Sequence, residues 1–298
     1  MDHLYHITVV IPTYNRPDTL DRAINSVLNQ SVKDVEVIVV DDNNPDTEGR
    51  ALTEAKMSVF SNNTRVRYIR HEHNKNGSAA RNTGARAALG EWIAFLDDDD
   101  EFLPMKLELQ LKTLEGRGEE WACCYSKYAI RKPGKELVKS NEHREGNLYL
   151  EALMREFHIA SGSNLLIKKA AFDSINGFDE SFIRNQDIEL LTRLLRRYKI
   201  AYSDYCGLIV NLHNNHSYFD EQDIINQYVA RFQPFVSELS HEEQAIFYRE
   251  INKQRFFDYF RVKRDMGKCA QMIQRGEVSF IDAISLIMRK SFYYLKRL

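Results

Sequence analysis

Several common signatures of function are missing from this chain of 298 residues. The first apolar run is followed by PTYNRP and not by GxGxxG, which disfavours an NAD-dependent oxidoreductase. No GxxxxGK[ST] occurs, which disfavours a P-loop enzyme. A nucleotidyltransferase would want a glycine-rich loop with a basic residue after the first strand, and PTYNRP does not provide one. The familiar phosphate-binding loops are therefore poor explanations of this sequence.

Cysteine, net charge and long apolar runs are also scarce. The four cysteines lack CxxC pairing and zinc-ligand spacing, so we expect reduced thiols. A formal net charge of −2 gives no reason to expect a nucleic-acid partner. No apolar run approaches the roughly 18 residues that span a bilayer, and the N-terminus MDHLYHITVV is unlike a secretory signal. These absences predict a cytoplasmic protein.

The first hundred residues alternate strand and helix patterns. Strands are predicted at HITVVIP, VEVIVVDD, VRYIRHE and EWIAFLDD. Helices are predicted between them at DTLDRAINSVLNQ, PDTEGRALTEAKMSVF and GSAARNTGARAALG. Continuous apolar strands joined by helices are typical of an α/β fold with a mostly parallel central sheet flanked by helices.

Two clusters of acidic residues end two of these strands, at Asp41–Asp42 and at Asp97 to Asp100. Because ligands of such sheets bind outside the carboxyl ends of the strands, both clusters should face one crevice. Hard divalent cations such as Mn²⁺ or Mg²⁺ prefer carboxylate oxygens, and one would offset the repulsion among four aspartates. The alternative is a solvated acidic turn in which one aspartate caps the following helix.

The rest of the chain is mixed and then helical. SNLLIKKAAFDSI runs from strand into helix, QDIELLTRLLRRY is a strong helix, and KIAYSDYCGLIVNLH is a strand pair or one long strand. From residue 219 the sequence is polar, aromatic and helical, and from 251 it holds eleven Lys/Arg against four Asp/Glu. Such a basic region suits an anionic membrane surface. It equally suits a helical cap on the chain's own core or a homodimer contact, and the sequence leaves these open.

Five blocks in order resemble glycosyltransferase family 2. They are VVIPTYNRPDTLDRAINSVLNQ, VEVIVVDDNNPD, NGSAARNTGARAALGEWIAFLDDDDEFLP, NGFDE and NQDIELLTRLL, within residues 5–215. The resemblance implies a GT-A fold with a Rossmann-like sheet. It implies a catalytic domain at residues 1–218, with the nucleotide-sugar part at about 1–100 and the acceptor part at about 101–218. Residues 219–298 would form a helical C-terminal region.

The resemblance also lends roles to residues at the donor side. Asp42 matches the carboxylate that accepts a hydrogen bond from the nucleotide base, and Asp99 matches the metal ligand of the DxD motif, with Mn²⁺ or Mg²⁺ as the ion. His213 is a second candidate metal ligand, with a surface histidine as the alternative. The residues expected at the nucleotide are Pro12, Thr13, Tyr14, Arg16, Asp42, Arg81, Asn82, Asp97 and Asp98. For Arg81 a plain salt bridge remains an alternative.

Sugar transfer also needs a base for the acceptor hydroxyl. Asp187 matches the family's catalytic aspartate and heads the apolar face of its predicted helix, where a capping role is the alternative. Ser161, Gly162, Ser163 and Gln186 are expected at the acceptor. His71 and His73 are expected in a mobile polar loop.

The resemblance therefore implies an inverting, metal-dependent transferase. It would move a sugar from a nucleotide diphosphate donor, a UDP-sugar by the resemblance, to a hydroxyl of a glycan or lipid-linked acceptor. The expected setting is bacterial surface polysaccharide synthesis at the cytoplasmic side of the membrane. The alternative from another class is an inactive relative that serves as a sugar-binding or scaffold protein.

Overall fold

The computed structural model describes residues 6–135, 137–212 and 220–295, with side chains up to residue 288. The chain divides into two compact units. The first comprises Met1–Ala152 and Phe157–Asn214, and the second comprises Leu153–Glu156 and Asn215–Leu298. The sequence predicts the boundary between the catalytic domain and the helical region at residues 218/219. Each unit is described separately below.

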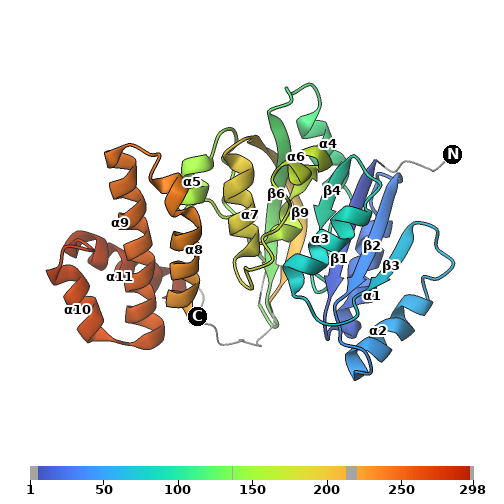
Figure 1. The fold of residues 1–298 in the computed structure, drawn as a ribbon, viewed down its shortest axis with the longest axis horizontal. Coiled ribbons are helices and arrows are strands. Elements are labelled where there is room, and N and C mark those ends of the chain that lie inside the picture. Colours follow the sequence, from blue (N-terminus) through green and yellow to red (C-terminus); the bar gives the residue numbers. More distant parts are fainter. Residues whose placement is uncertain (1–5, 136, 213–219, 296–298) are drawn as a thin grey trace. The chain divides into compact units, whose positions relative to one another are not determined.

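The first part of unit 1 is the predicted alternation of strands and helices (Figure 1). The elements are β1 (Ile7–Thr13), α1 (Pro17–Leu28), β2 (Val35–Asp41), α2 (Glu48–Ser58), β3 (Val66–Arg70), α3 (Gly77–Ala87) and β4 (Trp92–Phe95). The strands pair in parallel in the order β3-β2-β1-β4. Proline at the first position of α1 and Thr47 and Asn76 as the N-caps of α2 and α3 fix where these helices begin.

The second part of unit 1 extends the same sheet with mixed pairing. Its elements are β5 (Glu101–Phe102), α4 (Lys106–Leu114), β6 (Trp121–Arg131), β7 (Val138–Lys139), α5 (Tyr149–Leu153), the 3₁₀ turn η1 (Gly162–Asn164), β8 (Leu166–Lys168), α6 (Lys169–Ser174), α7 (Gln186–Leu195) and β9 (Lys199–Asn211). The sheet continues β4-β8-β6-β9-β5, and β8 is antiparallel to both of its neighbours. KIAYSDYCGLIVN forms one long strand and not a pair.

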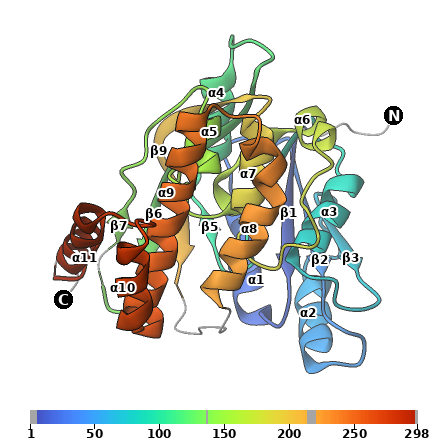
Figure 2. The ribbon, with the colours of Figure 1, turned by 60° about the vertical axis from the view of Figure 1, so that its left-hand side comes forward.

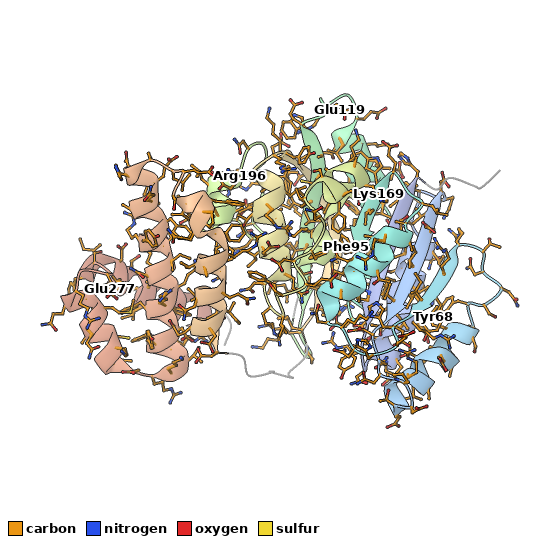
Figure 3. The ribbon with its side chains drawn as sticks, viewed as in Figure 1. Tyr68, Phe95, Glu119, Lys169, Arg196 and Glu277 are labelled. Atoms are coloured by element: carbon orange, nitrogen blue, oxygen red, sulfur yellow. The ribbon has the colours of Figure 1, made fainter. Side chains whose placement is uncertain are left out.

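Two apolar cores cover the two faces of the sheet. Successive residues of a strand point to opposite faces, so Val10 joins one core while Val9 and Ile11 join the other. Helices α3, α6 and α7 pack on the first face, and α1, α2 and α4 pack on the second. Phe95 of β4, labelled in Figure 3, packs against Phe172 and Phe178 with ring centroids 5.4 and 5.0 Å apart. This double coverage is what a buried α/β sheet requires.

Unit 2 is helical. Its elements are α8 (Glu221–Val236), α9 (His241–Asp258), the π-helical turn η2 (Tyr259–Lys263), α10 (Met266–Gln274) and α11 (Phe280–Leu295), seen from a second side in Figure 2. A capping box between Ser240 and Glu243 starts α9. Within the described residues, no helix combines the length and apolar character that crossing a membrane requires.

Candidate active site

The carboxyl ends of β1, β2 and β4 lie at one edge of the sheet. Thr13 at the end of β1 pairs in register with Asp41 at the end of β2, and the backbone N–H of Asp42 donates to the Thr13 carbonyl at 2.9 Å. On the other side of β1, the N–H of Leu96 donates to Val10 at 3.0 Å, so the aspartates after β4 emerge at the same edge. Both acidic clusters therefore border the segment that follows β1, as the topology rule for parallel sheets predicts.

Asp42 is 3 % exposed and its two carboxylate oxygens accept four hydrogen bonds from the protein. Oδ1 accepts from the Lys75 backbone N–H at 2.8 Å and lies 2.7 Å from His71 Nδ1. Oδ2 accepts from the Asn74 side-chain amide at 2.9 Å and from the Asn76 N–H at 3.0 Å. A carboxylate offers about four lone-pair positions, so the surrounding segment fills all of them.

His71 corrects one expectation. It was expected in a mobile polar loop, but it is buried, and its Nε2 lies 2.9 Å from the hydroxyl of Thr83 in α3. Its imidazole thus joins Asp42 to a helix on the far side of the ring. The sequence did offer a signal: HEHNKNG follows β3, whose carboxyl end adjoins that of β2. Polar residues after such a strand fall at the same edge of the sheet as Asp42.

The neighbouring Asp41 is fully buried and plays a structural part. Its Oδ1 accepts from the backbone and side-chain amides of Asn43 at 2.9 and 2.7 Å, and its Oδ2 pairs with Arg50 at 3.2 Å and accepts from the Tyr68 hydroxyl. Tyr68 is labelled in Figure 3. Burial raises the pKa of Tyr68, and its hydrogen bond to Asp41 adds to the effect.

The second acidic cluster, Asp97 to Asp100, is balanced by arginines from other elements. Nη1 of Arg16, just after β1, contacts Asp99 Oδ2 and lies 3.3 Å from Asp98 Oδ1. Arg81 of α3 pairs with Asp97 Oδ1. Within the described residues, Asp97, Asp98 and Asp99 thus each have a guanidinium partner, which offsets part of their mutual repulsion.

Backbone and amide groups complete the surroundings of this cluster. Arg22 Nη2 and Asn211 Nδ2 donate to the Asp99 carbonyl at 2.8 and 2.7 Å, and the Asn211 N–H donates to Asp100 Oδ1 at 3.1 Å. The N–H of Asp97 donates to the hydroxyl of Ser163 at 3.0 Å. The strand end is thereby tied to β9 and to the turn η1.

Burial changes the acidity of two members of the cluster. It raises the pKa of Asp98 to about 7, against the opposing effect of Arg16. It also raises the pKa of Asp100, with further contributions from the charges of Asp97 and Asp99. The cluster therefore retains mutual repulsion that its arginine partners do not remove entirely.

Asp187 lies in the first turn of α7, on the walls of two cavities. A polar cavity of about 190 Å³ is also lined by Arg81, Asp97, Ser161, Gly162, Phe178, Ile183, Arg184, Asn185 and Gln186. An apolar cavity of about 260 Å³ is lined on its other sides by Tyr128, Ile130, Phe157, His158, Ile159, Ala160, Ile188, Leu191, Val210 and Leu212. Burial raises the pKa of Asp187, although the backbone N–H of Ile188 and the charge of Arg81 act in the opposite direction.

Some of the remaining predicted residues border the edge of the sheet or the start of α7, and others lie inside the fold. Tyr14 is 48 % exposed beside the partly buried Pro12 and the buried Thr13, at the end of β1. Arg81 also donates to Gln186 Oε1 at 2.7 Å, which links α3 to the start of α7.

Asn82 and Ser163 are engaged within the fold. The Asn82 side chain exchanges hydrogen bonds of 2.9 Å with the backbone of Phe178 and donates to Glu180. Ser163 is fully buried and accepts from Asp97. Both therefore support the site from inside the fold. His213, the second metal candidate, lies outside the described residues.

Comparison with known proteins defines the class. A family model described as "Glycosyl transferase family 2" matches residues 8–175, which include β1 to β8 and both acidic clusters. The match and the α/β sheet with its acidic edge together define a glycosyltransferase of the GT-A fold. The match covers more than half of the sequence, and the chain belongs to glycosyltransferase family 2.

Individual relatives have low sequence identity to this chain. The amylovoran biosynthesis glycosyltransferase AmsB of Erwinia amylovora is 31 % identical over 191 residues, 62 % of this chain and 62 % of that protein. The GalNAc(5)-diNAcBac-PP-undecaprenol β-1,3-glucosyltransferase of Campylobacter jejuni is 31 % identical over 60 % of this chain and 57 % of its own length. The chain thus spans less than two thirds of either relative.

The fold also matches solved structures. The S. aureus TarS 1–349 structure in complex with UDP-GlcNAc aligns with a TM-score of 0.63 at 16 % identity, over 91 % of this chain and 92 % of that one. At this identity the likeness supports the fold alone.

Proposed function

We propose that this chain is an inverting, metal-dependent glycosyltransferase that moves a sugar from a UDP-sugar to a hydroxyl group of a glycan or lipid-linked acceptor. The observation that carries the proposal is the position of Asp187. Its carboxylate lines a polar cavity together with Arg81 and Asp97, and it also lines an apolar cavity. A base must reach the acceptor hydroxyl while the donor lies beside it. A side chain that lines two adjoining cavities can do so, because one cavity can hold the donor sugar and the other the acceptor.

In the proposed reaction, Asp187 accepts the proton of the acceptor hydroxyl while the hydroxyl oxygen attacks the anomeric carbon. The new carbon–oxygen bond forms on one face of the sugar, and the bond to the diphosphate oxygen breaks on the opposite face. The electron pair of that bond leaves with UDP. A single displacement of this kind inverts the anomeric configuration. The raised pKa of Asp187 makes its carboxylate a stronger base than an exposed aspartate.

The acidic cluster after β4 fits a divalent cation by the chemistry of its oxygen atoms. The described residues contain no group of three or more ligating side chains that could hold a metal ion. A Mg²⁺ or Mn²⁺ site completed by substrate phosphates needs only one or two carboxylates, however. Asp99 would hold the ion, with Asp97 beside it, and the ion would stabilise charge on the departing diphosphate. Arg16 would have to release Asp99 first.

The segment after β1 and Asp42 would bind the nucleotide base. Pro12, Thr13 and Tyr14 border this edge, and the exposed ring of Tyr14 offers a surface for a base. Each Asp42 oxygen already accepts two hydrogen bonds. A uracil N–H would therefore share one of these oxygens or replace a donor. UDP as the nucleotide is supported by a relative named UDP-Glc:α-D-GlcNAc-diphosphoundecaprenol β-1,3-glucosyltransferase WfgD from Escherichia coli, 36 % identical over 37 % of this chain and 41 % of that protein.

The names of relatives also support the proposed setting. Two of them name an undecaprenol-linked acceptor, and AmsB is named for amylovoran biosynthesis. We place the enzyme at the cytoplasmic side of a bacterial membrane, in surface polysaccharide synthesis, on this support.

The function is tested by hydrolysis of a panel of nucleotide sugars in the presence of Mn²⁺, which needs no knowledge of the acceptor. Slow release of UDP from one UDP-sugar, reduced in Asp187→Asn, is the expected result. Absence of turnover and of nucleotide binding across the whole panel would favour the inactive scaffold instead.

A further inference from the structure

Helix α11 of unit 2 packs with one face and leaves a second apolar face exposed. Ala283 is buried, and Leu286 and Ile287 are partly buried against a core cluster formed by Phe256, Cys269, Met272 and Val278. On the other side Phe280 is 65 % exposed, Ile281 79 %, Ile284 40 % and Met288 55 %. We call these four residues the α11 apolar face.

The spacing of the α11 apolar face is that of a single helical stripe. Positions i, i+1, i+4 and i+8 fall on one side of an α-helix, so these side chains are neighbours and not scattered surface residues. Single exposed apolar residues are ordinary, whereas a contiguous exposed set marks an interaction site.

The charge of the C-terminal sequence favours one kind of partner. Residues 251–298 contain eleven Lys/Arg and four Asp/Glu, and Arg289, Lys290, Lys296 and Arg297 are among the eleven. The acidic residue on the described part of the helix, Asp282, is paired with Lys253 of α9 at 3.5 Å and accepts a hydrogen bond from Ser279. The charge of Asp282 is thereby offset by that of Lys253.

We propose that the α11 apolar face inserts into the headgroup region of an anionic lipid bilayer, with the surrounding basic residues against the lipid phosphates. An apolar stripe in a basic, helical region is the pattern of helices that lie in the membrane interface. A second copy of this chain fits less well, because its equally basic region would face like charge. The inference rests on the proposed function in one respect: a lipid-linked acceptor gives such docking a purpose.

The experiment uses the full chain and two kinds of vesicle, phosphatidylcholine alone and phosphatidylcholine mixed with phosphatidylglycerol. The protein is expected to co-sediment with the mixed vesicles and to be released by high salt. A variant with Phe280→Ser, Ile281→Ser, Ile284→Ser and Met288→Ser should lose ~10-fold or more of this binding. The matched control, Leu52→Ser with Val59→Ser, removes exposed apolar residues of unit 1 and should bind as the parent does.

A second measurement guards against misfolding of the quadruple variant. Ile281→Trp should fold as the parent does, because position 281 is exposed, and its fluorescence should shift to the blue on adding mixed vesicles. Equal sedimentation of parent and quadruple variant, or no shift of the tryptophan, overturns the proposal. A parent dimer that the quadruple variant converts to a monomer overturns it in favour of a second copy. Hydrolysis of UDP-sugars without vesicles tests the proposed function separately.

Discussion

The two acidic clusters at the edge of the sheet have similar sequences and different physical situations. Asp42 is surrounded by donors that the protein supplies, including two backbone N–H groups and the buried His71. Asp99 is balanced by Arg16, whose side chain is 52 % exposed. The first carboxylate is held in place by its own fold, whereas the partner of the second can move away.

This difference teaches at which carboxylate a ligand displaces one exposed side chain and at which it competes with several fixed donors. Removing Asp42 would strand several donors, whereas removing Asp99 would also relieve repulsion from its acidic neighbours. A cation could replace Arg16 at Asp99 without rebuilding the fold. At Asp42, by contrast, a ligand would have to share an oxygen with, or replace, one of four donors that the segment His71–Asn76 holds in place.

The largest expected effect lies at neither cluster. Asp187→Asn should lower the transfer rate on the order of 100- to 10,000-fold, because the amide cannot accept the acceptor proton. Binding of UDP should stay near that of the parent. Kinetics and calorimetry on the same preparation measure the two quantities, and a variant with full turnover would rule out Asp187 as the base.

The stabilities of the variants Asp42→Ala and Asp99→Ala test the difference between the two clusters directly. Without metal, Asp42→Ala should lower the free energy of unfolding by about 3 kcal/mol or more, because it leaves His71 and other donors without their acceptor. Asp99→Ala should cost less than ~1 kcal/mol, since its loss also relieves repulsion. Urea titrations of the two variants measure both values. Equal losses would mean that the two clusters do not differ as described.

Asp99, whose loss should cost less stability than the loss of Asp42, should matter more for ligand binding. In the presence of Mn²⁺, Asp99→Ala should weaken UDP binding on the order of 10- to 100-fold, because the ion loses a direct ligand. In its absence, variant and parent should bind UDP alike. A loss of the same size with and without Mn²⁺ would contradict a role for Asp99 in holding the ion.

Arg16→Gln sharpens the comparison by removing the movable partner of Asp99. The affinity for Mn²⁺ alone should rise about 3- to 10-fold, since the ion no longer competes with the guanidinium. Arg22→Gln is the matched control, because it removes the same charge from a side chain that contacts the Asp99 carbonyl and Glu101. Electron paramagnetic resonance of free Mn²⁺ measures both. An equal rise in the two variants would indicate general electrostatics and not competition at Asp99.

A dependence of stability on pH is also expected. The pKa of Asp98 is raised from 3.8 to about 7, so the folded protein keeps a proton there that the unfolded chain releases. The stabilisation is complete below 3.8 and is lost as the pH rises through about 7. Asp98→Asn should remove this component. Thermal unfolding of parent and variant across that window, without metal, should give curves that diverge with pH, and parallel curves would contradict the assignment.

Much of this arrangement is readable from the sequence. The strands before Asp42 and Asp97 are largely apolar runs, VEVIVV and WIAF, so their burial and parallel pairing follow from pattern. The shared edge of the two clusters follows from the topology rule. The mixed pairing of β8 does not follow, because its three residues carry no signal of direction.

The partners of the aspartates could not be predicted in the same way. Arg16 is 83 residues from Asp99, and His71 is 29 residues from Asp42. Which arginine or histidine reaches which carboxylate depends on loop conformation, and single-sequence patterns do not encode it. The prediction for His71 was wrong because a run of polar residues is typical of a mobile loop. In the structure these residues share one buried acceptor, Asp42, which holds the segment in place.

We propose above all that the edge of the sheet binds a nucleoside diphosphate through a divalent ion held at Asp97 to Asp99. Calorimetric titration of the parent protein with UDP, with and without Mn²⁺, tests it most directly. We expect clear binding with Mn²⁺ and much weaker binding without it. Equal affinity under both conditions, or no binding under either, would contradict it.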